Sequence, residues 1–492
     1  MEDDAPLLLA LPDACLLAVL QCCAADDQRS LFSAARAHSR LHQVAVLAQR
    51  SITAVVAQQR QMDGVLMYLG RHWQHLYSVS IHYKGVGAHH PWLDLSMYIS
   101  VMTQLRSLQL SAVLLVAHDS EGLLAPTLTK LRLSSCELYS KGTAVALAAA
   151  VSQLSGLEHL SLAGLSTDRN RYVFPAGVLQ QLQQLTYLEL DDAIVEGPDQ
   201  DSSVLEVLQA LTRLEDLRLK ITAADADTIR VTASMLSAAH LLTRLDLAVH
   251  VPLEPAVLAG KTRLQHLLMQ NCMVGADGDA AALVGLLSQL QQLQQLTHLD
   301  LTTTLWVDGY GRTPHAAAYA PLTASSRLQH LNISICRLPA GVWQHIFPAG
   351  RQLPQLRELN ISDIRQPFGD DGTAPDGSGL VSCCPGLQSL DMRKVTCSAE
   401  LLAALQGLSQ LHTLLLSLHE SAWEGFEAMC QLTGLRQLGV GYLGGIERDL
   451  WLQMTQLKQL TALTYDDDDG TVSLISQVSN TGSIVTLAAW YL

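Results

Sequence analysis

Leu296-Thr297-His298-Leu299-Asp300-Leu301 is one copy of a six-residue pattern, L-x-x-L-x-L, that decides the fold of this chain. The pattern recurs from near residue 105 almost to the C-terminus, at steps of 22 to 32 residues. Degenerate copies stand at residues 76–81 and 484–489. Self-similarity at this period is typical of a solenoid. The copies begin at Leu105, Leu128, Leu157, Leu185, Leu214, Leu242, Leu264, Leu296, Leu328, Leu356, Leu387, Leu411, Leu435 and Leu460.

The spacing of the leucines indicates a short strand with one apolar face, because side chains alternate along a strand. A single short strand cannot bury its leucines alone. Parallel stacking of successive strands, about 4.8 Å apart, joins them into one continuous core. The pattern resembles the leucine-rich repeat. The resemblance implies an α/β fold, a leucine-rich-repeat solenoid shaped like a horseshoe, with a parallel sheet on its concave side.

The segments between the copies predict the opposite side of the solenoid. Residues 142–151, 203–211, 280–287 and 399–405 are rich in Ala and Leu, which favours helices. We therefore expect a mostly helical convex side. Two further stretches, Thr302–Ser326 and Asp363–Gly379, have the composition of loop insertions, and the second lacks the ligand order of a calcium loop. We expect Asp466–Asp469 to lie in a solvated loop.

Composition and charge limit the classes of partner. The chain has 492 residues, is 49% hydrophobic and 16% charged, and carries a net charge of −15. These values predict a large core and argue against unspecific binding of nucleic acid or anionic membranes. The excess of acidic residues lies in the repeats, so a basic patch on a partner is the natural complement. No apolar run of 18 residues occurs, and we expect no membrane-spanning helix.

The ten cysteines indicate a reducing compartment. Cys136, Cys272 and Cys336 each follow the last apolar residue of a copy by three positions, where the leucine-rich repeat takes an inward Asn or Cys. The adjacent pairs at 22–23 and 383–384 lack the spacing of a zinc site. We expect no metal and no cofactor. A cytoplasmic location fits best, with the nucleus or a ciliary axoneme as alternatives.

The N-terminal stretch 7–20 is apolar, but acidic residues precede it and Pro12-Asp13 interrupts it, which argues against a signal peptide. Pro12 and Asp13 suit a helix start, and a second amphipathic helix is expected from about Arg29 to Gln49. The segment 8–48 resembles an F-box. The residues that carry the resemblance are Leu11-Pro12-Asp13, Leu16, Val19-Leu20, Leu31-Phe32 and Arg40-Leu41.

The resemblance implies that this segment docks a Skp-type adaptor of a cullin–RING (SCF) ubiquitin ligase while the repeats hold the substrate protein. It implies adaptor contacts at Leu11, Pro12, Leu16, Val19, Leu20 and Leu31. The alternative is a helical cap that only covers the first repeat. The expected organisation is an F-box-like segment at 1–50, a transition and N-terminal cap at 51–100, and the solenoid at 101–492.

The x positions that flank the second and third leucines are expected to face the concave surface. One column there reads His266, His298 and His330, which parallel strands would place roughly 5 Å apart. Three interpretations of this column are open. It is a neutral polar surface, or a pH-sensitive contact site, or, least favoured, a metal site, because metal ligands converge whereas stacked strands hold these side chains parallel. The expected partner-binding residues are Tyr187, Glu189, Asp216, Arg218, Arg244, Asp246, His266, His298, Asp300, His330, Asn332, Glu358 and Asp391.

The sequence carries no hydrolase elbow, phosphate loop, dinucleotide fingerprint or zinc-protease motif. We therefore expect a protein-binding adaptor without catalytic residues, monomeric apart from its partners, that serves as an F-box substrate receptor. The alternative is a leucine-rich-repeat scaffold without a ubiquitin role, such as a cytoskeletal or axonemal protein. An enzyme is the third and least favoured option.

Overall fold

The computed structural model describes residues 11–26, 40–41, 44–45, 50–85, 90–94, 102–116, 123–167, 170–191, 194–196, 204–221, 231–249, 252–274, 280–305, 314–366, 374–417, 423–441, 456–466 and 472–476. The chain divides into two compact units, Met1–Leu214 and Glu215–Leu492.

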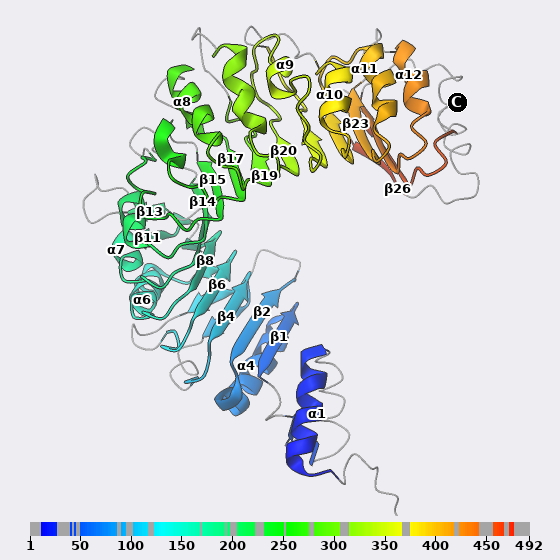
Figure 1. Cartoon of the computed structure of the whole chain (residues 1–492). Helices are drawn as coiled ribbons and strands as arrows, with labels where there is room; N and C mark the ends of the chain where they lie inside the picture. Colours follow the sequence, from blue (N-terminus) through cyan, green and yellow to red (C-terminus); the bar gives the residue numbers. More distant parts are fainter. Residues whose placement is uncertain are drawn as a thin grey trace, which may run out of the picture. The chain divides into compact units, whose positions relative to one another are not determined.

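The first unit contains a parallel sheet in which successive repeats are hydrogen-bonded neighbours (Figure 1). One register column runs Val79, Leu108, Leu131, Leu160 and Leu188, and each of these side chains is buried. The degenerate copy at 76–81 is part of this sheet. The strands are β1 (Ser51–Val56), β2 (Ser78–Tyr83), β4 (Ser107–Ser111), β6 (Lys130–Ser134), β8 (His159–Ala163) and β12 (Tyr187–Asp191).

The second unit continues the same construction. Its buried leucine column includes Leu217, Leu245, Leu267, Leu299 and Leu331 and continues to Leu463. The parallel strands are β14 (Asp216–Ile221), β15 (Arg244–Val249), β17 (His266–Gln270), β19 (His298–Asp300), β20 (His330–Asn332), β21 (Glu358–Asn360), β22 (Ser389–Met392), β23 (Thr413–Ser417), β24 (Gln437–Gly441) and β25 (Ala462–Asp466). A final strand, β26 (Val472–Ser476), is antiparallel to β25. The degenerate copy at 484–489 lies outside the described residues.

Several strands of the two sheets are followed, within three residues, by a residue in the left-handed backbone region, which turns the chain out of the sheet. Thr303, Ile335 and Lys394 all have φ 56°, a conformation uncommon for residues other than Gly. The backbone N–H of such a residue donates to the next repeat: Thr303 to the Ser334 carbonyl at 3.2 Å and Ile335 to the Ser362 carbonyl at 2.9 Å. The turn thus extends the hydrogen-bond ladder beyond the strand.

The next residue points into the core, as predicted for the cysteines. Cys136, Cys272 and Cys336 are at most 2% exposed. The Cys272 and Cys336 thiols donate to the carbonyl oxygens of Leu247 and Leu301 in the preceding repeat, at 3.3 and 3.2 Å. Burial raises the pKa of Cys336 to about 12, which keeps it a thiol. A buried small donor at this position satisfies a carbonyl that water cannot reach.

The return segments of the first unit combine short strands and helices. Ser140 caps one helix, α6, because its hydroxyl accepts from the Thr143 N–H at 3.2 Å. The elements are α4 (Gln59–His72), η2 (Trp73–His75), β3 (Trp92–Asp94), β5 (Leu114–Val116), β7 (Glu137–Leu138), α6 (Lys141–Ser152), β9 (Ser166–Thr167), β10 (Asn170–Arg171), β11 (Val173–Pro175), α7 (Ala176–Leu179), β13 (Ile194–Glu196) and η3 (Val204–Ala210).

The second unit has helices along one side of its sheet (Figure 1). Ser398 caps α11 by accepting from the Leu401 N–H at 3.2 Å. The elements are β16 (Pro252–Leu253), η4 (Pro255–Leu258), β18 (Met273–Val274), α8 (Ala280–Leu290), η6 (Ala316–Thr323), α9 (Trp343–Ile346), α10 (Gly377–Cys383), α11 (Ala399–Ala404), η7 (Leu405–Gly407) and α12 (Trp423–Cys430). The predicted helices at 142–151, 280–287 and 399–405 are confirmed, whereas the described part of 203–211 contains the 3₁₀ helix η3 in place of an α-helix.

Two of the predicted loop insertions are partly wrong. The stretch Thr302–Ser326 contains the 3₁₀ helix η6, in which Tyr319 and Leu322 are buried although Pro321 lies inside the helix. The stretch Asp363–Gly379 ends in α10, which begins at Gly377. Burial of apolar side chains against the repeat core outweighs the loop-forming composition in both segments. Of the predicted loop Asp466–Asp469, only Asp466 lies within the described residues, and it is the last residue of β25.

The N-terminal part of the first unit contains α1 (Asp13–Asp26) and helical turns at 40–41 and 44–45. Leu16 and Leu20 are buried together with Leu41, Val44 and Ala45. Arg40 donates to the Asp13 carboxylate at 2.7 Å and to the Leu11 carbonyl at 2.9 Å. The rest of the helix expected from Arg29 to Gln49 lies outside the described residues.

Candidate functional site on the polar face of the sheet

The x positions of the repeats form a polar face, defined here as the sheet surface opposite the buried leucine columns. The alternation of burial along each strand places them there. In β17, for example, Leu267 and Met269 are buried, whereas the side chains between and beside them are half-buried on the opposite face. Every partner-binding residue predicted from the sequence lies at such a position on a described strand. Their arrangement is set by the register, which brings equivalent positions of successive repeats together.

Three histidines of successive repeats stack on this face in the second unit. Register pairs His266 with His298 and His298 with His330. Their ring centroids are 4.2 and 4.0 Å apart, with interplanar angles of 24° and 14°. These distances are shorter than the strand spacing used for the prediction, because neighbouring rings lie nearly face to face. We name His266, His298 and His330 the histidine column.

Burial and mutual repulsion lower the pKa of two members of the histidine column, His298 and His266. Burial, followed by the neighbouring His330 and His266, lowers the pKa of His298 to about 4. Burial lowers the pKa of His266 as well, with a further contribution from the charge of Arg244. The physical cause is the same in both rings: the charged imidazolium loses hydration and meets a second positive charge nearby.

Ion pairs flank the column on both sides. Arg218 pairs with Asp216 at 3.1 Å and Arg244 with Asp246 at 3.9 Å. At the other end, His330 Nδ1 lies 2.8 Å from Glu358 Oε2. Burial raises the pKa of Asp246, while Arg244 and Arg218 oppose that rise.

Several of the predicted binding residues also hold the strand ends in place. Asp300, Asn332, Asn360 and Asp391 each end the polar row of their strand, and the side chain accepts from the backbone N–H two residues further on. The distances lie between 2.9 and 3.2 Å. This is the Asx turn, in which a side chain replaces a backbone acceptor. A partner would therefore meet these groups already oriented.

The polar face of the first unit carries its own cluster. Tyr187 stacks on His159 with ring centroids 3.8 Å apart. The Glu189 carboxylate accepts from the Ser161 hydroxyl at 2.6 Å and from the Tyr187 hydroxyl at 2.9 Å. Arg132 lies 3.9 Å from the same carboxylate. Tyr187 and Glu189, both predicted from the sequence, are thus brought together.

The six residues predicted to bind an adaptor do not share one environment. Leu16 and Leu20 are 0% and 3% exposed inside the N-terminal cluster, whereas Val19 is 41% exposed and Pro12 is exposed. Leu11 packs partly against the cluster. Leu31 lies outside the described residues.

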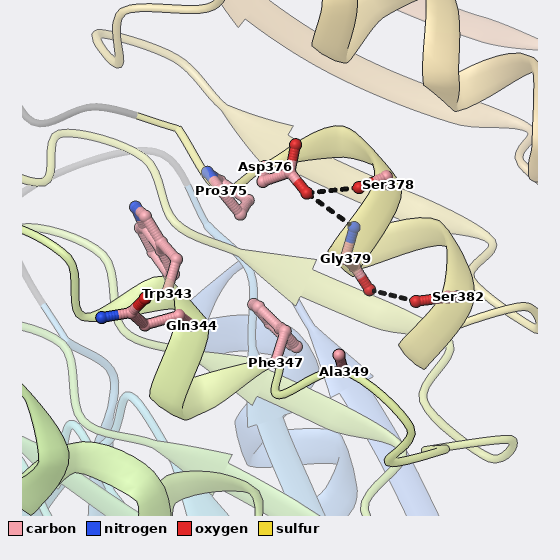
Figure 2. Close-up of a pocket in the computed structure, with 9 residues that line it drawn as sticks. All are labelled: Trp343, Gln344, Phe347, Ala349, Pro375, Asp376, Ser378, Gly379 and Ser382. Carbon is pink, nitrogen blue, oxygen red and sulfur yellow. Dashed lines mark hydrogen bonds between the residues drawn. The ribbon is translucent and has the colours of Figure 1, made fainter.

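A pocket that the sequence did not reveal lies on the helical side of the second unit, between α9 and α10 (Figure 2). It has a volume of about 240 Å³ and is lined by Trp343, Gln344, Phe347, Ala349, Pro375, Asp376, Ser378, Gly379 and Ser382. The Asp376 carboxylate in this pocket already caps α10, because it accepts from the backbone N–H of Gly379 at 3.0 Å. In the sequence, the signal available for this pocket was the pair of aromatic residues Trp343 and Phe347, four positions apart.

Over the described ranges, no group of three or more His, Cys, Asp or Glu side chains could hold a metal ion. None of the helices in the described part of the chain is both long enough and apolar enough to cross a membrane.

Comparison with known proteins gives a likeness in fold. No family model matches the chain, and no curated protein matches it. An internalin (InlF) from Listeria monocytogenes is 19% identical over 68% of this chain and 86% of that one, with a TM-score of 0.39. The leucine-rich-repeat ectodomain of the receptor kinase GASSHO1/SCHENGEN3 from Arabidopsis thaliana, solved with CASPARIAN STRIP INTEGRITY FACTOR 2, is 15% identical over 84% of this chain, with a TM-score of 0.41. TLR13, solved with ssRNA13, is 18% identical over 82%, with a TM-score of 0.44.

The chain spans 58% and 56% of the length of the last two structures, and at these identities the likeness concerns the fold alone. The in-register leucine columns, the inward donors and the helical return segments make this chain a leucine-rich-repeat solenoid. This is the fold class that the repeat pattern predicted.

Proposed function

We propose that this chain is a non-enzymatic protein-binding scaffold and that the polar face holds the partner. The observation that supports this proposal is the fixed orientation of the charged and polar groups on β14–β22. Strand register, ring stacking and Asx turns immobilise these side chains before a partner arrives. Binding therefore requires less ordering of side chains than binding to a mobile surface, which increases affinity.

The test is affinity capture by the full chain, compared with variants of the polar face. Arg244→Glu combined with Glu358→Arg reverses charge on that face without touching the leucine columns. Arg263→Glu combined with Glu427→Arg is the matched control, because both side chains are exposed and lie off the polar face. We expect the first pair to lose at least tenfold in affinity for the captured protein and the control pair to retain it. Equal binding by both pairs would refute the proposal.

We further propose, from the F-box resemblance, that the N-terminal helices dock a Skp-type adaptor and that the scaffold is a substrate receptor of an SCF ubiquitin ligase. Because Leu16 and Leu20 are buried, an adaptor would have to contact Pro12, which precedes α1, and the exposed side of α1 at Val19. Val19→Asp should abolish adaptor pull-down by the full chain. Ala14→Asp, also on an exposed part of α1, controls for the added charge and should leave binding intact.

The alternative is a scaffold without a ubiquitin role, such as a cytoskeletal or axonemal protein. The burial of Leu16 and Leu20 with Leu41 favours it, because these leucines are then used inside a helical cap. Failure of the wild-type chain to bind any Skp-type adaptor, together with recovery of the chain in purified cytoskeletal or axonemal fractions, would select this alternative.

A further inference from the structure

The hydrogen bonds of the histidine column fix which ring nitrogen carries the proton. The Thr297 hydroxyl donates to the Gln265 carbonyl at 3.0 Å, so its oxygen accepts from His298 Nδ1 at 2.8 Å. His330 Nδ1 lies 2.8 Å from the Glu358 carboxylate, which can only accept. In their neutral forms both rings therefore carry the proton on Nδ1 and keep Nε2 as an acceptor.

The two acceptors belong to adjacent, stacked and partly exposed rings. The ring centroids of His298 and His330 are 4.0 Å apart, and the His330 side chain is 32% exposed. In the part of the chain that the structure describes, neither Nε2 has a hydrogen-bond partner. A ligand with two donors in one plane would satisfy both.

The charge around these acceptors favours a cation. On the β14–β15 side, Asp216 and Asp246 are balanced by Arg218 and Arg244, and on β22 Asp391 is balanced by Arg393 at 2.7 Å. Two carboxylates at this end of the column, Asp300 on β19 and Glu358 on β21, form no ion pair with an arginine of the described strands. Asp300 accepts from the Gln270 amide and the Thr302 hydroxyl, and Glu358, whose side chain is 59% exposed, accepts from His330.

We propose that His298 and His330, together with Asp300 and Glu358, receive an arginine side chain of the bound partner; this inference rests on the proposed protein-binding function. A guanidinium group is planar, presents several N–H donors in a fixed fork and stacks on ring faces. It can donate to both Nε2 atoms while its charge lies near the two carboxylates. A lysine ammonium is a point charge and matches the carboxylates but not the paired acceptors.

The site depends on neutral rings. Protonation of either imidazole converts its Nε2 from an acceptor into a donor and adds a positive charge next to the guanidinium. The charged groups that act on His266 and His298 include Asp216, Arg218, Arg244 and Glu358. Arg218 and Arg244 lie on β14 and β15, whereas Asp300 shares β19 with His298 and Glu358 pairs with His330, so the arginine belongs at the His298–His330 end.

The experiment uses the full chain and two fluorescein-labelled probes, Gly-Arg-Gly-Arg-Gly and Gly-Lys-Gly-Lys-Gly, in fluorescence anisotropy at pH 7.5. We expect the arginine peptide to bind at least tenfold more tightly than the lysine peptide. His298→Phe combined with His330→Phe keeps the stacked rings but removes both acceptors, and should abolish the preference. His412→Phe is the matched control, because His412 Nδ1 also lies 3.1 Å from a threonine hydroxyl but outside the column.

Equal affinity for the two peptides, or an unchanged arginine preference in the double variant, would overturn the inference. If the double variant does not give the wild-type circular dichroism spectrum, His330→Gln and Glu358→Gln serve as separate surface variants and should each reduce the preference at least threefold. Partner capture by the wild-type chain is scored independently. Capture without any arginine preference refutes this inference alone, whereas loss of capture refutes the proposed function.

Discussion

Thr304 allows the inward donor position to be tested by a conservative substitution. Its hydroxyl is 1% exposed and donates to the Met269 carbonyl of the preceding repeat at 2.5 Å. Thr304→Val keeps the shape of the side chain and removes only this donor. The variant leaves a buried carbonyl without its side-chain partner and places a methyl group beside it.

The expected cost follows from these changes. A lost hydrogen bond that leaves a buried polar group unsatisfied costs roughly 1–3 kcal/mol, and the added methyl group returns at most about 0.8 kcal/mol. We expect Thr304→Val to lower the free energy of unfolding by about 1–2 kcal/mol. Thr304→Cys should cost less, because Cys272 and Cys336 donate from the same position in neighbouring repeats.

Urea titration of the full chain measures this effect as a lower midpoint at unchanged slope. Thr461→Val is the control, because the Thr461 hydroxyl makes a similar bond to the Arg436 carbonyl, at 3.0 Å, at an exposed position where water can replace it. The control should change the free energy by no more than about 0.5 kcal/mol. Unfolding of Thr304→Val at the wild-type urea concentration would refute the role assigned to the inward donor.

Three further predictions concern other parts of the chain. Because the folded state lowers the pKa of His298 to about 4, the unfolded chain takes up the proton first as the pH falls below about 6.5, so folding stability decreases from pH 7 to pH 5; His298→Phe should flatten this dependence in urea titrations at the two pH values. Leu16→Ala should destabilise the N-terminal cluster by about 2–5 kcal/mol, seen as faster trypsin cleavage there, whereas Val19→Ala should not. Iodoacetamide should alkylate the exposed Cys15 in the native chain but Cys336 only after denaturation, as peptide mass spectrometry can show.

The sequence was sufficient for the core because the core depends on local periodicity. Leu299 and Leu331 are separated by 32 residues, yet each is placed by its own strand pattern, and register then pairs them. Cys272 was assigned an inward position from its distance to the preceding leucine, and it is 2% exposed. Such positions follow from the two-residue alternation of a strand and require no knowledge of neighbouring repeats.

The sequence was insufficient where several apolar residues compete for the same interior. Leu16, Val19 and Leu20 recur at i, i+3 and i+4, which predicted one apolar stripe of α1, but the pattern did not reveal which of them would be buried. The structure buries Leu16 and Leu20 against residues 41–45 and leaves Val19 exposed. The composition of Thr302–Ser326 likewise predicted a loop, but burial of Tyr319 and Leu322 stabilises the 3₁₀ helix η6 within it.

By itself the sequence determined that this chain is a stack of parallel strands with a leucine core, and it named the residues of the polar face, because strand periodicity is a local property. Only the tertiary structure decided how those residues interact. The proximity of the His298 and His330 rings and the proton positions set by Thr297 and Glu358 both depend on contacts between strands. These contacts form only when each repeat is aligned on the next.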